Sequence, residues 1–299
     1  MYLLFYVDDM CLTGNNDAII KHLLDSLAKE FMMKDLGPLH YFLGVQAHFH
    51  RDGLFLSQEK YGTDLLINAG MKDCAPMPTP LPLQLDKLED IQFSVNYVCQ
   101  KMHEPTISDF QLLKRILRYI KGTVRMGINL SSNSASNLTA FSDSDYAGCK
   151  DTICSTCGFC TFLGTNIISW SAKRHPTVSK SSTEAEYRTM SEVASEIKWI
   201  SSLLRDLGVA QPHTPEIFCG NLSAIYLSTN SSLHSRSKHF DTDFHYVRER
   251  VALGTLVVTF LHTPSSQMCL PSHCLNNLFL LFVPNLVFAY HPTQVCGGV

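Results

Sequence analysis

Two hydrophobic patterns organise the first 70 residues. Residues 1–14 are rich in β-forming side chains and predict a β-hairpin, in which YLLFYV is one strand, Asp8-Asp9 forms the tip and MCLTG returns. Helical spacing of apolar residues then begins, with Asn16 or Asp17 available as the N-cap. The following segments predict a helix over residues 17–31, a second hairpin that turns at residues 50–53, and a helix over residues 58–69.

The second half of the chain predicts a helix, then strands, then more helices. Ser108 with Gln111 indicates a capping box for the helix FQLLKRILRYIKG, which ends at Gly122. This order is typical of an α/β (α+β) domain with a mixed sheet. The later elements are the strands MGINL, LTAFS, GFCTFLG and NIISW, a long helix over about Thr183 to Leu207, the strand EIFC, helices through LSAIYL and DFHYVRERV, and the strand TLVVTFLH.

Two segments break this regular pattern. Residues 73–90 carry four prolines between positions 76 and 82, which predicts an extended linker and not a packed element. No Asp, Glu, Lys or Arg follows Arg250, so residues 268–299 are expected to be disordered or poorly packed. A frameshift or readthrough product and a membrane-associating segment are the two explanations for this tail. Its longest apolar run is too short for a membrane span of roughly 20 residues.

Composition limits the classes of protein that the chain can represent. With 45% hydrophobic residues it can bury a core, which excludes global disorder. The formal charge of −3 means that any grip on nucleic acid must come from local basic patches. Eleven irregularly spaced cysteines and the lack of a signal peptide or transmembrane segment favour a reducing, intracellular compartment, cytoplasm or nucleus.

One basic patch lies on the helix that follows Ser108. The patch has two interpretations of equal weight, a solvated helix face and a face that grips nucleic-acid phosphates. Its members are Lys114, Arg115, Arg118 and Lys121.

Two pairs of carboxylates are candidates for metal chemistry. Asp8 and Asp9 are adjacent at the predicted hairpin tip, where a solvated turn is the alternative explanation. Asp143 lies near the end of a strand, and Glu186 lies in the first turns of the long helix. Carboxylates from a strand and from a helix packed over it can converge on one divalent ion.

Cysteines and histidines offer a weaker metal hypothesis. Cys149, Cys154, Cys157 and Cys160 have spacings that occur in iron–sulfur and zinc sites. Strand alternation would place neighbouring thiols on different faces, however, and the histidines show no helical i, i+4 pair that favours a ligand set.

Several long motifs in the same order resemble the Pol polyproteins of copia-type LTR retrotransposons. FYVDDMCLTGN, FMMKDLGPLHYFLGV and LLKRILRYIKGT are similar to the end of that family's reverse transcriptase. SDSDYAGCKDTICSTCGFCTFLGTNIISWSAKRHPTVSKSSTEAEYRTM, IFCGNLSAIYLSTN and RSKHFDTDFHYVRERV are similar to its ribonuclease H domain. The resemblance implies RNA-directed DNA synthesis and RNA–DNA hybrid cleavage, both with Mg²⁺. Asp8, Asp9, Asp143 and Glu186 would be catalytic metal ligands, and His239 would lie near the hybrid.

The resemblance also divides the chain. It implies a ribonuclease H-like fold preceded by a partial polymerase palm and thumb. The expected parts are a partial reverse transcriptase at residues 1–72, a linker with a deletion junction at 73–90, thumb or connection helices at 91–130, a ribonuclease H-like domain at 131–267, and the aberrant tail at 268–299.

Departures from the family pattern imply defective catalysis. The family has Cys-Asp-Asn where this chain has Cys219-Gly220-Asn221, so a metal ligand is replaced by a glycine. The family's upstream polymerase aspartate and its final nuclease carboxylate have no counterpart in these 299 residues. We therefore expect an inactive retrotransposon fragment. A residual nucleic-acid-binding domain and a domesticated interaction protein are the alternatives.

Overall fold

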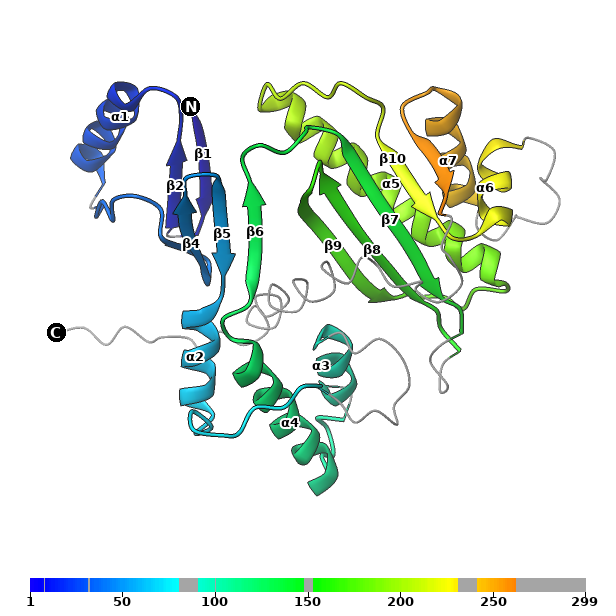
Figure 1. Cartoon of the computed structure of the whole chain (residues 1–299), viewed down its shortest axis with the longest axis horizontal. Coiled ribbons are helices and arrows are strands. Elements are labelled where there is room, and N and C mark those ends of the chain that lie inside the picture. Colours follow the sequence, from blue (N-terminus) through cyan, green and yellow to red (C-terminus); the bar gives the residue numbers. More distant parts are fainter. Residues whose placement is uncertain are drawn as a thin grey trace.

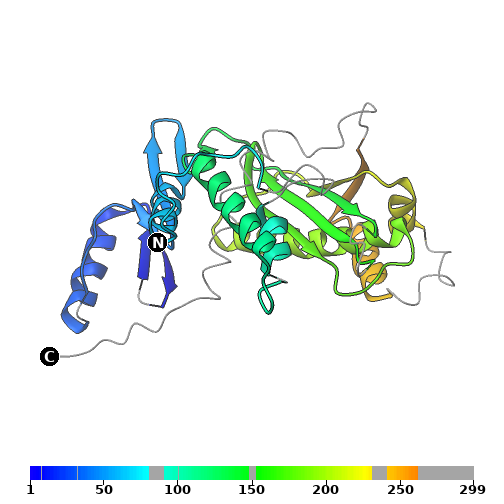
Figure 2. The same cartoon turned by 90° about the horizontal axis from the view of Figure 1, so that it is seen from below.

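The computed structural model describes residues 1–7, 9–31, 33–80, 91–99, 101–147, 153–230 and 241–261 of the chain. Within these ranges the chain forms three sheets, a two-stranded hairpin, a four-stranded sheet and a five-stranded sheet (Figure 1). Seen from below, the N-terminal hairpin and the five-stranded sheet lie at opposite ends of the molecule, with helix α4 between them (Figure 2). No helix in these described ranges has both the length and the apolar character needed to cross a membrane.

The N-terminal hairpin forms as expected, but its turn comes one residue early. Tyr6 of β1 pairs with Asp9, so Asp9 opens the return strand β2 and is not part of the tip. Asn16 caps the next helix, because its side chain accepts hydrogen bonds from the N–H groups of Ala18 and Ile19. The elements are β1 (Tyr2–Tyr6), β2 (Asp9–Thr13) and α1 (Asp17–Glu30).

The four-stranded sheet joins residues that are far apart in the sequence. The predicted second hairpin, β4 and β5, is confirmed, and β6 pairs with β5 from some 70 positions away. Two glycines permit this pairing, because a Cβ atom at Gly53 would collide with the carbonyl of Leu130 and one at Gly127 with that of Leu56. The elements are β3 (Tyr41–Phe42), β4 (Val45–His50), β5 (Gly53–Ser57), α2 (Glu59–Asn68) and β6 (Gly127–Ser131).

Helix α4 (Ile107–Thr123) begins earlier than its predicted cap. The capping box uses Thr106 and Asp109, not Ser108 and Gln111. The Thr106 hydroxyl accepts from the Asp109 N–H at 3.2 Å, and the Asp109 carboxylate accepts from the Thr106 N–H at 3.0 Å. Asp109 also pairs with Lys101 at 3.3 Å, an interaction that Gln111 cannot make as an uncharged amide. The preceding helix is α3 (Ile91–Cys99).

The proline-rich segment is packed where the structure describes it, contrary to the prediction of a free linker. The Arg115 guanidinium donates to the Thr79 hydroxyl at 2.6 Å, and the Arg118 Nε donates to the Ala75 carbonyl at 2.7 Å. Met77 adds a backbone hydrogen bond to the Arg118 carbonyl at 3.0 Å. These contacts dock residues 75–79 along α4. The remainder of the segment, 81–90, lies outside the described residues.

The five-stranded sheet confirms the predicted ribonuclease H-like fold. Its strand order is β11-β10-β7-β8-β9, in which β7, β8 and β9 are antiparallel and β10 runs parallel to both β7 and β11. The elements are β7 (Leu138–Asp145), β8 (Thr156–Leu163), β9 (Asn166–Arg174), α5 (Ser182–Asp206), β10 (Glu216–Cys219), α6 (Leu222–Thr229), α7 (Asp241–Ala252) and β11 (Val257–Phe260).

Each face of this sheet is covered by a separate apolar core. One face packs against α5, α6 and α7, and strand alternation places Cys157 and Phe159 of β8 on it. The other face presents Cys160, which packs with Ile116 and Ile120 of α4. Because the sheet is buried on both sides, α4 is attached to the ribonuclease H-like domain through a hydrophobic core and not only through its chain connection.

Candidate active site

Asp143 and Glu186 approach each other near the C-terminal end of β7, the central strand of the five-stranded sheet. Asp143 lies near the end of β7, and Glu186 lies on the first turns of α5, which packs across that strand. Burial raises the pKa of Glu186 to about 8, and the nearby charge of Asp143 contributes to the rise. Burial also raises the pKa of Asp143. The two carboxylates are therefore close enough to repel each other in a poorly solvated position.

Neutral groups around the pair offset part of this repulsion. The Ser144 backbone N–H hydrogen-bonds both carboxylates and lowers both pKa values. The Cys219 thiol donates to the Glu186 Oε2 at 3.9 Å. Burial raises the pKa of Cys219 to about 11, so the thiol keeps its proton and serves as a donor near pH 7. Sequence reasoning missed the roles of Ser144 and Cys219, because their contacts with Glu186 join β7 and β10 to α5.

The sheet register locates the glycine that replaces an aspartate of the family pattern. Cys219 on β10 pairs with Ser142 on the parallel strand β7. Gly220 directly follows the last residue of β10, and Asp143 is the next residue of β7, so the register places the two positions side by side. Gly220 is not among the described glycines that have a positive φ, so its backbone conformation does not demand a glycine.

The donor set fits a Mg²⁺ ion only in part. Mg²⁺ commonly uses one or two protein carboxylates and keeps several waters, which matches Asp143 with Glu186. Among the described residues, no group of three or more His, Cys, Asp or Glu side chains is placed to hold a metal ion. Asp145 closes β7 with an exposed side chain, and we interpret it as a flanking acid.

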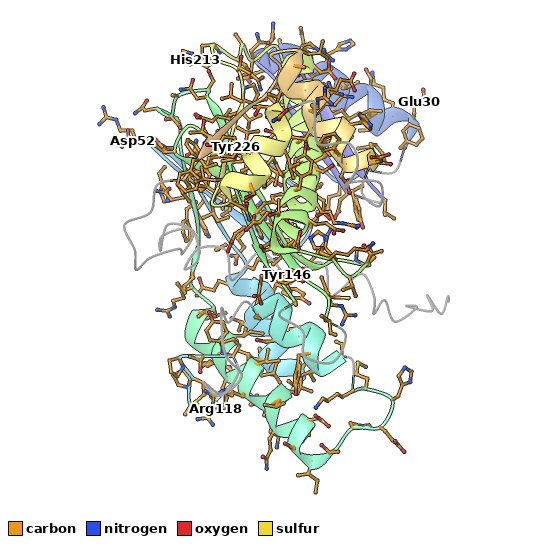
Figure 3. All side chains as sticks on the ribbon, turned by 90° about the vertical axis from the view of Figure 1, so that its right-hand side faces the viewer. Glu30, Asp52, Arg118, Tyr146, His213 and Tyr226 are labelled. Carbon is orange, nitrogen blue, oxygen red and sulfur yellow. The ribbon has the colours of Figure 1, made fainter. Side chains whose placement is uncertain are left out.

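The remaining predicted site residues are dispersed over the chain. Asp9 is exposed at the start of β2, whereas Asp8 and His239 lie outside the described residues, so their catalytic and hybrid-binding roles stay predictions. On α4, Arg115 and Arg118 are engaged with residues 75–79. Arg118 lies at the opposite end of the molecule from His213 (Figure 3).

The cysteines of the weaker metal hypothesis are separated by strand alternation. Cys157 and Cys160 belong to the cores on opposite faces of the sheet, and Cys149 lies outside the described residues. The Cys157 thiol donates to Glu192 Oε2 at 3.4 Å, and Glu192 Oε1 lies 3.8 Å from the Nδ1 atom of His175. Burial raises the pKa of Cys157 and lowers that of His175, which favours an uncharged thiol beside a neutral imidazole.

A five-stranded sheet in this order, with carboxylates from β7 and α5 at one edge, defines a ribonuclease H-like domain. It is joined here to a segment of another class, since a family model described as "Reverse transcriptase (RNA-dependent DNA polymerase)" matches residues 1–82. The chain belongs to the family of retrovirus-related Pol polyproteins of copia-type transposons, as its motifs indicated.

Named relatives support this membership. The chain is 41% and 39% identical, each over 88% of its length, to the retrovirus-related Pol polyproteins from the Arabidopsis thaliana transposons RE1 and RE2. It spans 20% of the length of each of these polyproteins. It is also 53% identical, over 68% of its length, to an Arabidopsis thaliana protein named as an uncharacterized mitochondrial protein, of which it covers 95%.

Solved structures resemble the chain more distantly. A foamy viral protease-reverse transcriptase in complex with double-stranded DNA is 13% identical, with a TM-score of 0.46, and the match covers 89% of this chain and 47% of that one. A ribonuclease H1 isolated from compost is 13% identical, with a TM-score of 0.33, and the match covers 51% of this chain and 99% of that one.

Proposed function

We propose that this reverse transcriptase–ribonuclease H fragment binds RNA–DNA hybrids but hydrolyses them far more slowly than an intact family nuclease. The observation that carries the proposal is the strand register at the sheet edge. It sets Gly220 beside Asp143, at a position where the family pattern supplies a metal-binding aspartate.

The expected slow hydrolysis has an electrostatic cause, which is the small number of anionic side chains that could bind metal ions. Two-ion hydrolysis of a phosphodiester requires enough carboxylates to hold two divalent ions next to the substrate phosphate. Asp143 and Glu186 supply two negative charges, Gly220 supplies none, and residues 251–299 contain no carboxylate side chain. Asp143 and Glu186 would hold one Mg²⁺ through its hydration shell, where the ion would supply Lewis-acid activation of the phosphate. A second ion would have too few ligands.

The protein's own groups would prepare the site for that single ion. The Ser144 N–H orients both carboxylates, and the Cys219 thiol orients the Oε2 atom of Glu186. With the pKa of Glu186 at about 8, a divalent cation must displace a proton from Glu186 at neutral pH. This competition weakens metal binding further.

Nucleic-acid binding would rest on the basic residues of α4 that remain available. Lys114 and Lys121 keep ammonium groups that no hydrogen bond or ion pair described here engages with protein, although Lys114 lies over the Phe110 ring at 4.7 Å. Arg115 and Arg118 already donate to residues 75–79 and would contribute charge more than direct contacts. Each phosphate contact that is lost should reduce the salt dependence of binding by about one ion.

The test is cleavage of an RNA–DNA hybrid with Mg²⁺ or Mn²⁺. We expect no measurable product from the unaltered chain. Gly220→Asp, combined with a C-terminus that restores the family's final carboxylate, should bind Mg²⁺ at least about tenfold more tightly and recover cleavage. Gly220→Asn in the same background is the matched control, because it adds equal bulk without charge.

Two results would contradict the proposal. One is robust cleavage by the unaltered chain that Asp143→Asn abolishes, since other groups would then supply the missing ligands. The other is a hybrid affinity, measured in EDTA by gel mobility, that neither rising salt nor the double variant Lys114→Gln, Lys121→Gln reduces.

A further inference from the structure

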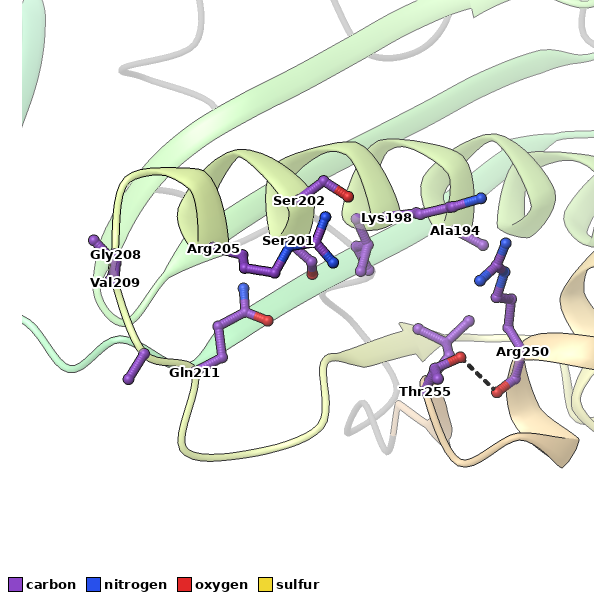
Figure 4. Close-up of a pocket in the computed structure, with 13 residues that line it drawn as sticks. Ala194, Lys198, Ser201, Ser202, Arg205, Gly208, Val209, Gln211, Arg250 and Thr255 are labelled. Atoms are coloured by element: carbon purple, nitrogen blue, oxygen red, sulfur yellow. Dashed lines mark hydrogen bonds between the residues drawn. The ribbon is translucent and has the colours of Figure 1, made fainter. Parts of the chain in front are cut away.

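A separate cavity lies at the other end of α5 from the carboxylate pair. It has a volume of about 560 Å³ and is bounded by the C-terminal half of α5, the loop at 208–211 and the end of α7 (Figure 4). Ser201 follows Glu186 by 15 residues on the same helix, which corresponds to about 22 Å along its axis. The cavity is therefore not part of the candidate active site.

The polar lining of this cavity is cationic. Three basic residues contribute, Lys198 and Arg205 from α5 and Arg250 from α7, and no Asp or Glu is among the 13 described residues that line it. Arg205 has a side chain that is 78% exposed, with Asp206 at 3.9 Å as its acidic neighbour. The exposed basic side chains at the rim of the cavity therefore attract anions.

Three polar atoms in the cavity wall lack hydrogen-bond partners in the described part of the chain. They are Ser201 Oγ, Gln211 Nε2 and Arg250 Nε, and all three are shielded from solvent. A buried polar group without a hydrogen-bond partner is destabilising, so three in one wall point to a missing partner. Figure 4 shows the side chains of Arg205 and Gln211 beside Ser201, and the guanidinium of Arg250 farther along α5, toward Ala194 and Lys198.

Hydrogen-bonded turns at the ends of α5 and α7 hold the backbone of the residues that carry these atoms. Gly208 ends α5 with a φ of 71°, and Val209 donates to the Leu204 carbonyl at 2.8 Å, which forms a Schellman turn before Gln211. At the end of α7, the Thr255 N–H donates to the Arg250 carbonyl at 3.0 Å, and the Arg250 guanidinium lies 5.2 Å from the Tyr246 ring centre.

We propose that this cavity binds a phosphate group. Guanidinium groups bind phosphate oxygens through paired, charge-assisted hydrogen bonds, and Lys198 adds a point charge at the rim. The hydroxyl of Ser201 and the amide of Gln211 supply neutral donors to the remaining oxygens. The phosphate would come either from a free ion or nucleotide or from a nucleic-acid backbone. The site does not depend on hybrid cleavage or on the carboxylate pair.

The experiment titrates the full 299-residue chain with inorganic phosphate by calorimetry at constant ionic strength. We expect saturable binding at one site. Arg250→Gln should weaken it at least about tenfold, because the variant loses a charge-assisted hydrogen bond to the anion. Lys198→Gln tests the exposed rim with little risk to folding. Arg51→Gln, on the β4–β5 turn, makes the same charge change elsewhere and should leave affinity within about twofold.

Competition then identifies the source of the phosphate. Displacement of phosphate by a nucleoside monophosphate but not by an RNA–DNA hybrid assigns a free ligand, and displacement by the hybrid assigns a backbone phosphate. Both results support the site. Undetectable phosphate binding by the unaltered chain would overturn it, as would equal losses in Arg250→Gln and Arg51→Gln. The outcome of the hybrid-cleavage assay bears only on the proposed function.

Discussion

Replacing Glu186 with Gln should stabilise the fold at neutral and alkaline pH. Glu186 is buried beside Asp143, and both influences raise its pKa from 4.5 to about 8. An ionised carboxylate in that position is poorly solvated and repelled, whereas a glutamine keeps a similar shape without the charge. The variant therefore isolates the electrostatic cost of the candidate metal site.

The direction of the pH dependence follows from proton linkage. The folded state holds the Glu186 proton more tightly than the unfolded state. The contribution of this proton to the free energy of unfolding is therefore fully present below pH 4.5 and is lost as the pH rises through about 8. A pKa difference of this size corresponds to about 3 kcal/mol of lost stability at pH 7 and to about 5 kcal/mol well above pH 8, both as upper estimates.

The measurement is urea unfolding of the unaltered chain and of Glu186→Gln between pH 5 and pH 9. The two free energies of unfolding should be similar near pH 5 and diverge above it, with the variant more stable. Glu249→Gln, on the exposed face of α7, is the matched control and should follow the unaltered chain. Mg²⁺ added at pH 8 should stabilise the unaltered chain more than Glu186→Gln.

Parallel stability curves for the unaltered chain and Glu186→Gln across this pH range would refute the reasoning. Such a result would mean that Glu186 is solvated, or that Asp143 is protonated in its place. The same unfolding curves for Asp143→Asn separate these two explanations, since only the second predicts that Asp143→Asn abolishes the pH dependence.

Three further outcomes are expected. Arg118→Ala should destabilise the chain by about 0.5–1.5 kcal/mol, the net value of an exposed hydrogen bond, and speed proteolysis near Ala75, whereas Lys121→Ala should not; equal cleavage rates would argue against docking of the segment. Templated primer extension by the 299-residue chain should be undetectable, because one hairpin cannot clamp two ions; extension that Asp8→Asn removes would contradict this. Deleting residues 268–299, which lie outside the described residues, should raise solubility, and a clearly lower Tm would instead place them in the core.

Local sequence determined the secondary structure well. Helical spacing located α5 to within one residue of its predicted ends, and alternation with turn residues located the β4–β5 hairpin. The α4 cap was misplaced because Ser108 and Thr106 both begin a plausible box. Tertiary context decided between them, since Asp109 pairs with Lys101 across the turn between α3 and α4.

The proline-rich segment shows where local pattern fails. Its composition predicts an extended chain, and nothing within residues 73–80 indicates a partner. The contacts that dock it come from Arg115 and Arg118, which lie 36 and 43 positions from the groups they bind. The pairing of these donors with backbone and hydroxyl acceptors exists only in the folded chain.

The two candidate sites differ in how much the sequence revealed. Asp143, Glu186 and Gly220 were found by the motifs that surround them, but only the pairing of Ser142 with Cys219 showed that Gly220 emerges beside Asp143. The phosphate cavity has no motif, because its residues come from α5, a loop and α7. Local sequence determines the periodicity of each element. The convergence of charges and unsatisfied donors depends instead on packing between elements that are far apart in the chain.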